Sequence, residues 1–280
     1  MSLIPAVLKD ETLRADIDQT VPVSGVVIWW LGQSTFLVKA RDGCVLFDPY
    51  LSDSLTRKYH DTDKPHVRMT ELAIRGDQLT GVDLVTSTHN HTDHLDAETL
   101  GPLIDANPNI TMVIPEANRA FVAKRIGCVA DWPIGLNDSE SRVVGTMTIH
   151  AVPAAHNTVD RDEMGRCKYL GYVVEIDGTT VYHSGDTLLY PGMAELLRPF
   201  AVDVAILPIN GHRPERRVSG NLFGDQAAQL AKEIGAKVVI PCHFDMFTFN
   251  TESPKLFVET CEAIGQPYRV MRCGEPFKVA

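Results

Sequence analysis

The first part of the chain alternates short apolar runs with polar turns. Apolar runs cover 26–31, 35–38 and 44–47, and an Arg-Asp-Gly turn at 41–43 separates the last two. An Asp-Gly pair between apolar runs is typical of a β-hairpin. We therefore expect three antiparallel strands in succession. The first 20 residues are rich in charge and predict a peripheral helix.

Later in the chain, runs with helical and strand-like patterns alternate. The pattern predicts strands at 84–88, 110–114, 203–208 and 237–241, helices at 97–106, 116–126, 225–234 and 253–264, a second strand-rich block over 143–182 and a terminal hairpin near 269–279. Two strand-rich blocks, each followed by helix–strand alternation, predict an α/β (α+β) fold. In such a fold two sheets pack face to face with helices outside.

Composition narrows the classes of partner. The 280 residues are 44% hydrophobic and 22% charged, which is typical of a globular protein, and the formal net charge is -10. An acidic chain disfavours nucleic acid, whose phosphates need a basic surface. No apolar run approaches the roughly 18 residues that cross a bilayer. Six scattered cysteines without a close pair predict reduced thiols and a cytoplasmic location. We expect a small-molecule partner, with a homo-oligomer left open.

The densest chemistry lies in residues 88–96, Thr-His-Asn-His-Thr-Asp-His-Leu-Asp. His89 and His91 are two residues apart after an apolar strand, so their side chains point the same way. Asp93 and His94 fall in the turn that follows. Imidazole and carboxylate groups are the ligands of catalytic zinc and related divalent ions. This corner can therefore aim two ligands at one ion and two at a neighbour.

Three more candidate ligands each follow a strand-like run: His156, Asp186 and His243. Strand ends on a rigid base are where functional loops collect. Each residue alone has a structural explanation as a capped or solvated side chain. Together with the motif at 89–94, the three predict one shared metal site.

The HxHxDH motif at 89–94, followed by these three residues in order, resembles the metallo-β-lactamase superfamily from about residue 26 to 280. The resemblance implies a four-layer αβ/βα sandwich, with 1–24 as a peripheral segment and 25–280 as one hydrolase domain. It implies one metal bound by His89, His91 and His156, a second bound by Asp93, His94 and His243, and Asp186 bridging both. Segments 29–32, 182–186 and 236–245 resemble the L-ascorbate-6-phosphate lactonase group, which is associated with divalent metal, often manganese.

Two divalent ions, zinc or manganese with iron as a third candidate, can hold a bridging water and lower its pKa toward neutrality. This predicts a hydrolase that uses a metal-bridging hydroxide on a small anionic metabolite, a lactone first. Asp93 is expected to orient the hydroxide or relay a proton as well as bind metal. A phosphodiesterase or nuclease of the same fold is an alternative. A diiron redox protein is another, although those proteins resemble HxExDH and this chain has Asn90. A non-catalytic metal-stabilised module is a third.

Residues around the ligands are expected to orient them or to meet the substrate. Asp48 and Asp96 are candidates to hold the second nitrogen of a ligating histidine, although each also suits a turn or a helix cap. In the loop 211–224, His212 is expected to serve in catalysis and Arg213 to bind an anionic group. The neighbouring Arg216 and Arg217 are expected to be solvated. Segments 50–80, 157–168 and 211–224 are candidate lids.

Overall fold

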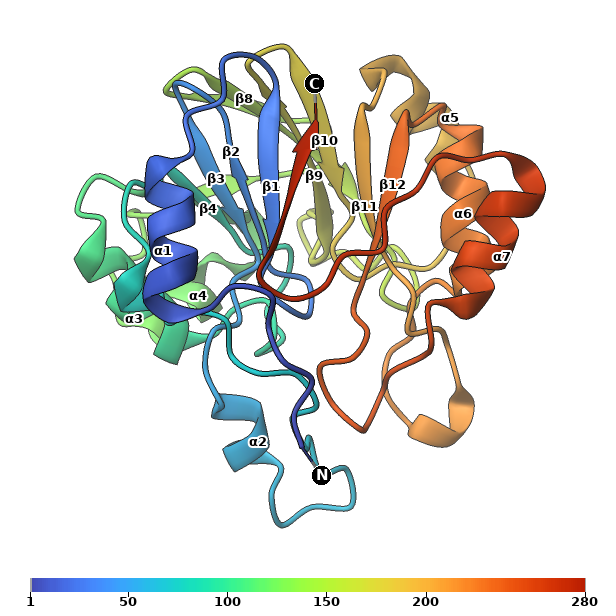
Figure 1. Cartoon of the computed structure of the whole chain (residues 1–280), viewed down its shortest axis with the longest axis horizontal. Coiled ribbons are helices and arrows are strands. Elements are labelled where there is room, and N and C mark those ends of the chain that lie inside the picture. The colour runs from blue at the N-terminus through green and yellow to red at the C-terminus, as the bar shows by residue number, and fades with distance from the viewer. Residues whose placement is uncertain (1, 280) are drawn as a thin grey trace.

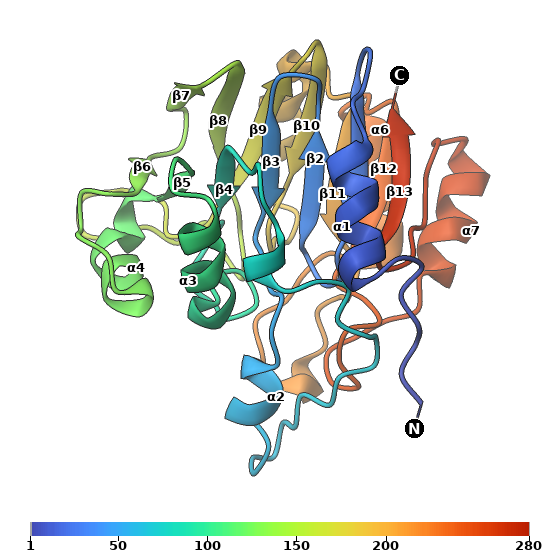
Figure 2. The same cartoon turned by 60° about the vertical axis from the view of Figure 1, so that its left-hand side comes forward.

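Two β-sheets lie face to face at the centre of the molecule, as the computed structural model of residues 2–279 shows (Figure 1). Helices α1, α3 and α4 cover the outer face of the first sheet, and α5, α6 and α7 cover the second (Figures 1 and 2). The predicted αβ/βα sandwich is confirmed. The helices span α1 Asp10–Gln19, α2 Ser54–Lys58, α3 Ala97–Ala106, α4 Arg119–Ile126, α5 Met193–Leu197, α6 Gly224–Glu233 and α7 Lys255–Ile264, with 3-10 turns η1 Gly76–Gln78, η2 Glu116–Asn118, η3 Arg198–Phe200 and η4 Pro214–Arg216.

The first sheet has seven strands in the order β13-β1-β2-β3-β4-β5-β6. They span β1 Val26–Trp30, β2 Phe36–Lys39, β3 Cys44–Phe47, β4 Leu84–Thr86, β5 Thr111–Pro115, β6 Ile134–Leu136 and β13 Glu275–Val279. The expected antiparallel succession β1-β2-β3 is present, and β3 to β6 run parallel. The terminal hairpin expected near 269–279 is wrong. Only β13 forms there, and it pairs with the free edge of β1.

The second sheet has six strands in the order β12-β11-β10-β9-β8-β7. They span β7 Ser141–Val144, β8 Met147–Pro153, β9 Leu170–Ile176, β10 Thr179–His183, β11 Val204–Pro208 and β12 Val238–Cys242. Strands β7 to β10 are antiparallel, whereas β10, β11 and β12 are parallel. Because β8 and β10 to β12 share one direction, their carboxyl ends meet at the same edge of the sheet.

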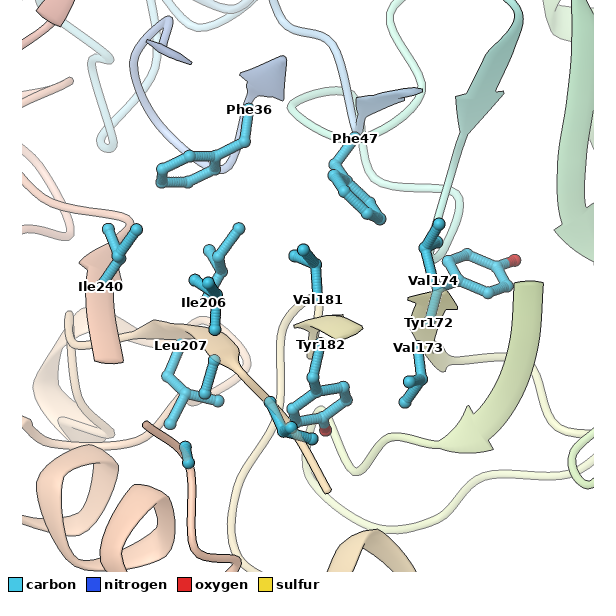
Figure 3. Packing of buried hydrophobic residues seen from close by; sticks show 14 of the residues in the cluster. Phe36, Phe47, Tyr172, Val173, Val174, Val181, Tyr182, Ile206, Leu207 and Ile240 are labelled. Carbon is cyan, nitrogen blue, oxygen red and sulfur yellow. The ribbon is translucent and has the colours of Figure 1, made fainter. Parts of the chain in front are cut away.

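The core follows the two-residue period of the strands. Phe36 and Phe47 point from the first sheet toward Ile206 and Ile240 of the second (Figure 3). Leu37, the neighbour of Phe36, belongs instead to the apolar cluster beneath α1 and α3. Both faces of strands β1 to β5 are therefore buried, so these strands are apolar at almost every position, whereas the edge strand β13 is partly exposed. The two sheets form a rigid base for the loops at their ends.

The irregular segment after β3 gathers at one end of the molecule. Helix α2 and the loop that contains η4 both lie at this end, at the bottom of Figures 1 and 2. Lys64 Nζ donates to the carbonyl of Arg217 at 2.7 Å, which joins the two segments. Among the described residues, no helix has both the length and the apolar character needed to cross a membrane.

Candidate metal centre

The seven residues predicted as metal ligands meet at the carboxyl ends of four strands. They form two groups that share Asp186. In each group the potential ligand atoms lie within 4.8 Å of one another. The first cluster comprises His89, His91, His156 and Asp186, and the second cluster comprises Asp93, His94, Asp186 and His243. The four candidate ligands of the motif thus divide between the clusters in the predicted way, with His89 and His91 in the first and Asp93 and His94 in the second.

Backbone conformation at the strand ends brings the clusters together. Strand β4 ends at Thr86, two residues earlier than expected, so the motif begins in a loop. Gly185, just before Asp186, has φ +59°, and a Cβ at this position would lie 2.6 Å from the Cβ of Thr88. The end of β10 therefore packs directly on the motif loop. His243, after β12, also has a positive φ of +61°.

In the first cluster, imidazole nitrogens face one another around a carboxylate. His91 Nδ1 lies 3.2 Å from His156 Nε2, which in turn lies 3.4 Å from Asp186 Oδ2. His156 is held from behind, because its Nδ1 lies 3.0 Å from the carbonyl oxygen of Gly220. That contact leaves Nε2 of His156 free to face the cluster.

In the second cluster, two carboxylates alternate with two imidazoles. His94 Nε2 lies 3.2 Å from Asp186 Oδ1 and 3.6 Å from Asp93 Oδ2. His243 Nε2 lies 3.4 Å from Asp93 Oδ2 and 3.5 Å from Asp186 Oδ2. Asp186 thus presents one oxygen to each imidazole of this cluster.

Buried polar atoms without partners show that the clusters suit cations. His89 Nε2, His94 Nε2 and Asp186 Oδ1 are buried and make no hydrogen bond of good geometry within residues 2–279, although the last two lie 3.2 Å apart. Unsatisfied buried polar groups are costly, so they call for an explanation. Three of them converging beside two carboxylates match the nitrogen and oxygen donor set of divalent zinc, manganese or iron. The residues present therefore fit the two-ion site that the resemblance implies.

A fully buried carboxylate, Asp48, orients two of the imidazoles. Its Oδ2 lies 2.7 Å from His94 Nδ1 and also accepts a hydrogen bond from the hydroxyl of Thr88. Thr88 Oγ1 in turn lies 3.1 Å from His89 Nδ1 and accepts from it, because its own proton goes to Asp48. Both rings therefore carry a proton on Nδ1 and turn Nε2, the nitrogen that a metal ion would bind, inward. This contact is the one expected for Asp48.

Asp96 does not share that role. Its carboxylate accepts hydrogen bonds from Ser52 Oγ and Thr99 Oγ1, both at 2.6 Å. Its carbonyl receives the first amides of α3, from Thr99 and Leu100. The expectation that Asp96 supports a ligating histidine is wrong, because its position at the N-cap of α3 turns the side chain toward the segment after β3.

The protonation of the two clusters differs. Burial lowers the pKa of His156 to about 4, and it holds the pKa of His89 well below its ordinary value. For His243 burial is outweighed by the nearby carboxylates, Asp186 above all, which raise its pKa to about 9. The same balance raises the pKa of His94. The first cluster therefore presents neutral imidazoles, and the second attracts positive charge.

A cavity of about 460 Å³ opens above both clusters. Its floor includes His91, Asp93, His156, Asp186 and His243. The residues that surround this floor are mostly basic, polar or aromatic, and they include Lys58, Tyr59, Lys64, His66, Asn90, Arg125, Asn157, Arg217, Ser219, Phe249 and Asn250. The only carboxylates among the lining residues are those of the floor.

The loop after β11 contributes a different cation from the one expected. Arg213 is exposed, pairs with Glu252 and is not among the cavity-lining residues, whereas Arg217 is. His212 is exposed too, and its ring packs against Gly220, where an added Cβ would lie 1.9 Å from Nδ1. Neither of these two side chains lines the cavity, because both point outward beside η4. His212 instead covers the backbone of Gly220, which in turn holds His156.

Several cavity residues were not predicted individually, although segment 50–80, which contains some of them, was a candidate lid. Lys58, Lys64 and His66 come from the irregular segment 50–80, and Arg125 comes from α4, where a basic residue near the end of a helix has an ordinary explanation. Gln33, in the turn between β1 and β2, also contacts the second cluster. A lone Gln after a Gly gives no clue to such a role.

Comparisons with known proteins agree with this geometry. A family model described as a β-lactamase superfamily domain matches residues 44–244. A UPF0173 metal-dependent hydrolase of Pyrococcus furiosus is 30% identical over 237 residues, which cover 83% of this chain and 90% of that protein.

Two solved structures share the fold. Igni18, a metallo hydrolase from Ignicoccus hospitalis, has a TM-score of 0.65 at 24% identity, over 91% of this chain and 99% of that one. CmlA, a diiron β-hydroxylase from Streptomyces venezuelae, has a TM-score of 0.67 at 16% identity, over 91% of this chain and 54% of that one. These two likenesses concern the fold alone. The family model and the relative show that the chain belongs to the metallo-β-lactamase superfamily, among the UPF0173 metal-dependent hydrolases.

Proposed function

We propose that the chain is a binuclear metal-dependent hydrolase of small anionic substrates, with a lactone as the first candidate. The observation that carries the proposal is the pair of clusters joined by Asp186, with three buried donor atoms lacking any other partner. Two divalent ions at these positions would polarise the substrate's carbonyl oxygen and lower the pKa of a water molecule held between them.

The residues of the chain have separate tasks in this scheme. Asp48, directly at His94 and through Thr88 at His89, holds a proton on Nδ1, so that Nε2 is the nitrogen that would bind an ion. Asp93 lies at the cavity floor, where its carboxylate is placed to orient a water or to accept its proton. Tyr59, His66 and Phe249 form an aromatic wall, with Tyr59 and His66 stacked at 4.5 Å between ring centroids. This wall limits the access of water from one side.

The charge around the cavity favours an anionic substrate. Lys58, Lys64 and Arg125 line it, and within residues 2–279 their recorded partners are a hydroxyl or backbone carbonyls rather than carboxylates. Although the net charge of the chain is -10, cationic side chains without a carboxylate partner lie together around this cavity. Such a gathering raises the local concentration of anions and suits a carboxylate or phosphate group.

The proposal is tested by elemental analysis of the purified protein, followed by assays with lactones and phosphoesters in zinc, manganese and iron. We expect two ions per chain and hydrolysis of an anionic lactone, which is lost in His243→Ala. Hydrolysis of phosphodiesters alone would favour the phosphodiesterase alternative. Oxygen uptake by the iron form without hydrolysis would favour the redox alternative. A protein that binds no metal, or that acts equally well with a chelator, would refute the proposal.

The substrate's charge is tested in the same assay. Lys58→Gln should raise KM about threefold for the anionic substrate and leave a neutral analogue unchanged, since an exposed charge pair contributes about 0.2–1 kcal/mol. Arg57→Gln is the matched control, because Arg57 lies in the same helix α2, is also exposed, pairs with Glu98 and does not line the cavity. An equal effect of both substitutions would point to a general change in the helix.

A further inference from the structure

Gln33 occupies an uncommon backbone conformation beside the second cluster. It lies in the turn between β1 and β2 with φ +49°, and only 3% of its surface is exposed. Residues other than glycine, asparagine and aspartate rarely adopt this left-handed conformation. The preceding Gly32, at φ +99°, occupies positive φ without that penalty. The turn thus places a long side chain where glycine or asparagine would cost less backbone strain. Strain of this kind persists where the side chain has a role that offsets it.

The backbone of Gln33 is fixed on two sides. Its carbonyl oxygen accepts a hydrogen bond from the indole Nε1 of Trp30 at 3.0 Å and another from the amide of His243 at 3.1 Å. The second bond links the turn directly to the loop after β12. Because the main chain is held in this way, the side chain of Gln33 has a defined starting point and direction toward the cluster.

The carboxamide of Gln33 reaches two members of the second cluster. Its Nε2 donates to Asp93 Oδ2 at 2.9 Å and lies 3.0 Å from His243 Nε2. These are the atoms through which Asp93 and His243 approach each other, at 3.4 Å. No hydrogen bond within residues 2–279 joins Gln33 to His89, His91 or His156. The contact is therefore specific to one half of the site.

We propose that Gln33 is a positioning residue for the second metal position. Its amide hydrogen bond fixes the Asp93 carboxylate relative to His243, so that both present their donor atoms to one divalent ion. The inference rests on the proposed metal-dependent function. It predicts that loss of the carboxamide weakens binding at the second cluster and spares the first.

The test is a calorimetric titration of the metal-free protein with Zn²⁺, repeated with Mn²⁺, for wild type and for two substitutions of Gln33. Gln33→Asn keeps an amide and suits a left-handed backbone but is one methylene shorter. Gln33→Met keeps the length without a donor. We expect the binding step at the second cluster to weaken about 10- to 100-fold in both variants, with the other step unchanged. Ser34→Ala is the matched control, because its buried hydroxyl in the same turn has no hydrogen-bond partner among the described residues.

Combining Gln33→Met with a substitution in either cluster shows which metal position loses affinity. With His156→Ala, which damages only the first cluster, the Gln33→Met loss should persist in full. With His243→Ala, which damages only the second, Gln33→Met should add nothing. Unchanged affinities in both Gln33 variants would overturn the inference. So would an equal loss at both steps with a lower melting temperature of the metal-free protein, since that marks a purely structural role. A wild-type protein that binds fewer than two ions overturns the proposed function as well.

Discussion

Replacing Asp48 with asparagine tests how one buried carboxylate controls the metal centre. Asp48 accepts four hydrogen bonds. Oδ1 receives those of Thr86 Oγ1 and the Thr88 amide, both at 3.0 Å, and Oδ2 receives those of His94 Nδ1 and the Thr88 hydroxyl. In Asp48→Asn the amide oxygen can keep the first two bonds. The side chain keeps its volume, and asparagine suits the φ of +41° at this position.

The change falls on the other two bonds. An NH2 group in place of Oδ2 donates, so His94 Nδ1 must present a lone pair and the proton moves to Nε2. That nitrogen faces Asp186 Oδ1 at 3.2 Å and is then unable to bind a metal. Loss of such outer support costs about 10- to 100-fold in metal affinity, which is about 1.4–2.8 kcal/mol. Because His89 is linked to Asp48 only through Thr88, we expect a smaller loss at the first cluster.

The assay is competition with a chelator of known affinity, together with thermal unfolding of the metal-free protein. Asp96→Asn is the control, since Asp96 is equally buried but its carboxylate bonds only to hydroxyls away from the clusters. We expect that variant to keep its metal affinity. The reasoning is refuted if Asp48→Asn binds metal as wild type does, or if Asp96→Asn loses as much.

Three further predictions concern removal of the metals, the glycine after β10 and an ion pair of the loop after β11. Removing the metals should lower the melting temperature by about 9 °C, because two ions, each at 100 times its Kd, together stabilise the fold by about 5.4 kcal/mol. Equal melting curves with and without chelator would contradict this. Gly185→Ala should destabilise the protein by about 2–5 kcal/mol through backbone strain and collision with Thr88. Gly178→Ala, at φ +74° with nothing within 4 Å, should cost only the strain of about 1–2 kcal/mol. Equal losses of stability in urea unfolding would show that the collision with Thr88 contributes nothing. Hydrogen bonds and charge from Arg213 and then Arg216 lower the pKa of Glu252 below 4.5, so its stabilisation is present above pH 4.5 and is lost as the pH falls through the lowered value. The difference in urea midpoint between wild type and Glu252→Gln should therefore shrink below pH 4.5, and a constant difference would show that the ion pair does not matter.

The sequence predicted the fold because hydrophobic periodicity is a local signal. Helix α3 occupies the predicted residues 97–106, and Gly127 ends α4 in the left-handed conformation expected of a C-terminal glycine. The end of the chain was mispredicted because β13 pairs with β1, about 250 residues earlier in the sequence, and no local pattern encodes that choice. The ligand residues were predictable for a different reason. Imidazoles and carboxylates at fixed spacing have few other uses.

The surroundings of the ligands are harder to predict, since they depend on how irregular segments turn. Arg213 and Arg217 are four residues apart in one loop, yet only Arg217 lines the cavity. The 3-10 turn η4 lies between them and directs the two side chains to different sides of the loop. Asp48 and Asp96 looked alike in sequence, but Asp48 directly follows β3 whereas Asp96 is the N-cap residue of α3, and their side chains point to different neighbours. Local backbone geometry, rather than residue type, therefore selects the supporting residues.

Left-handed backbone marks the site more clearly than composition does. Gln33, Asp48, Gly185 and His243 all have positive φ, and all lie at strand ends that border the clusters. Such a residue reverses the chain within one step, which lets the side chain turn inward instead of continuing along the strand. Three of these four positions carry a side chain in spite of the steric cost, and all three of these side chains contact the clusters. The cost is tolerated because no glycine could supply the contact. Positive φ alone does not identify the site, since Asp177 directly after β9 also has φ +45° and belongs to neither cluster. At the strand ends beside the clusters it coincides with the residues that form or support them, and it becomes visible only when the structure is known.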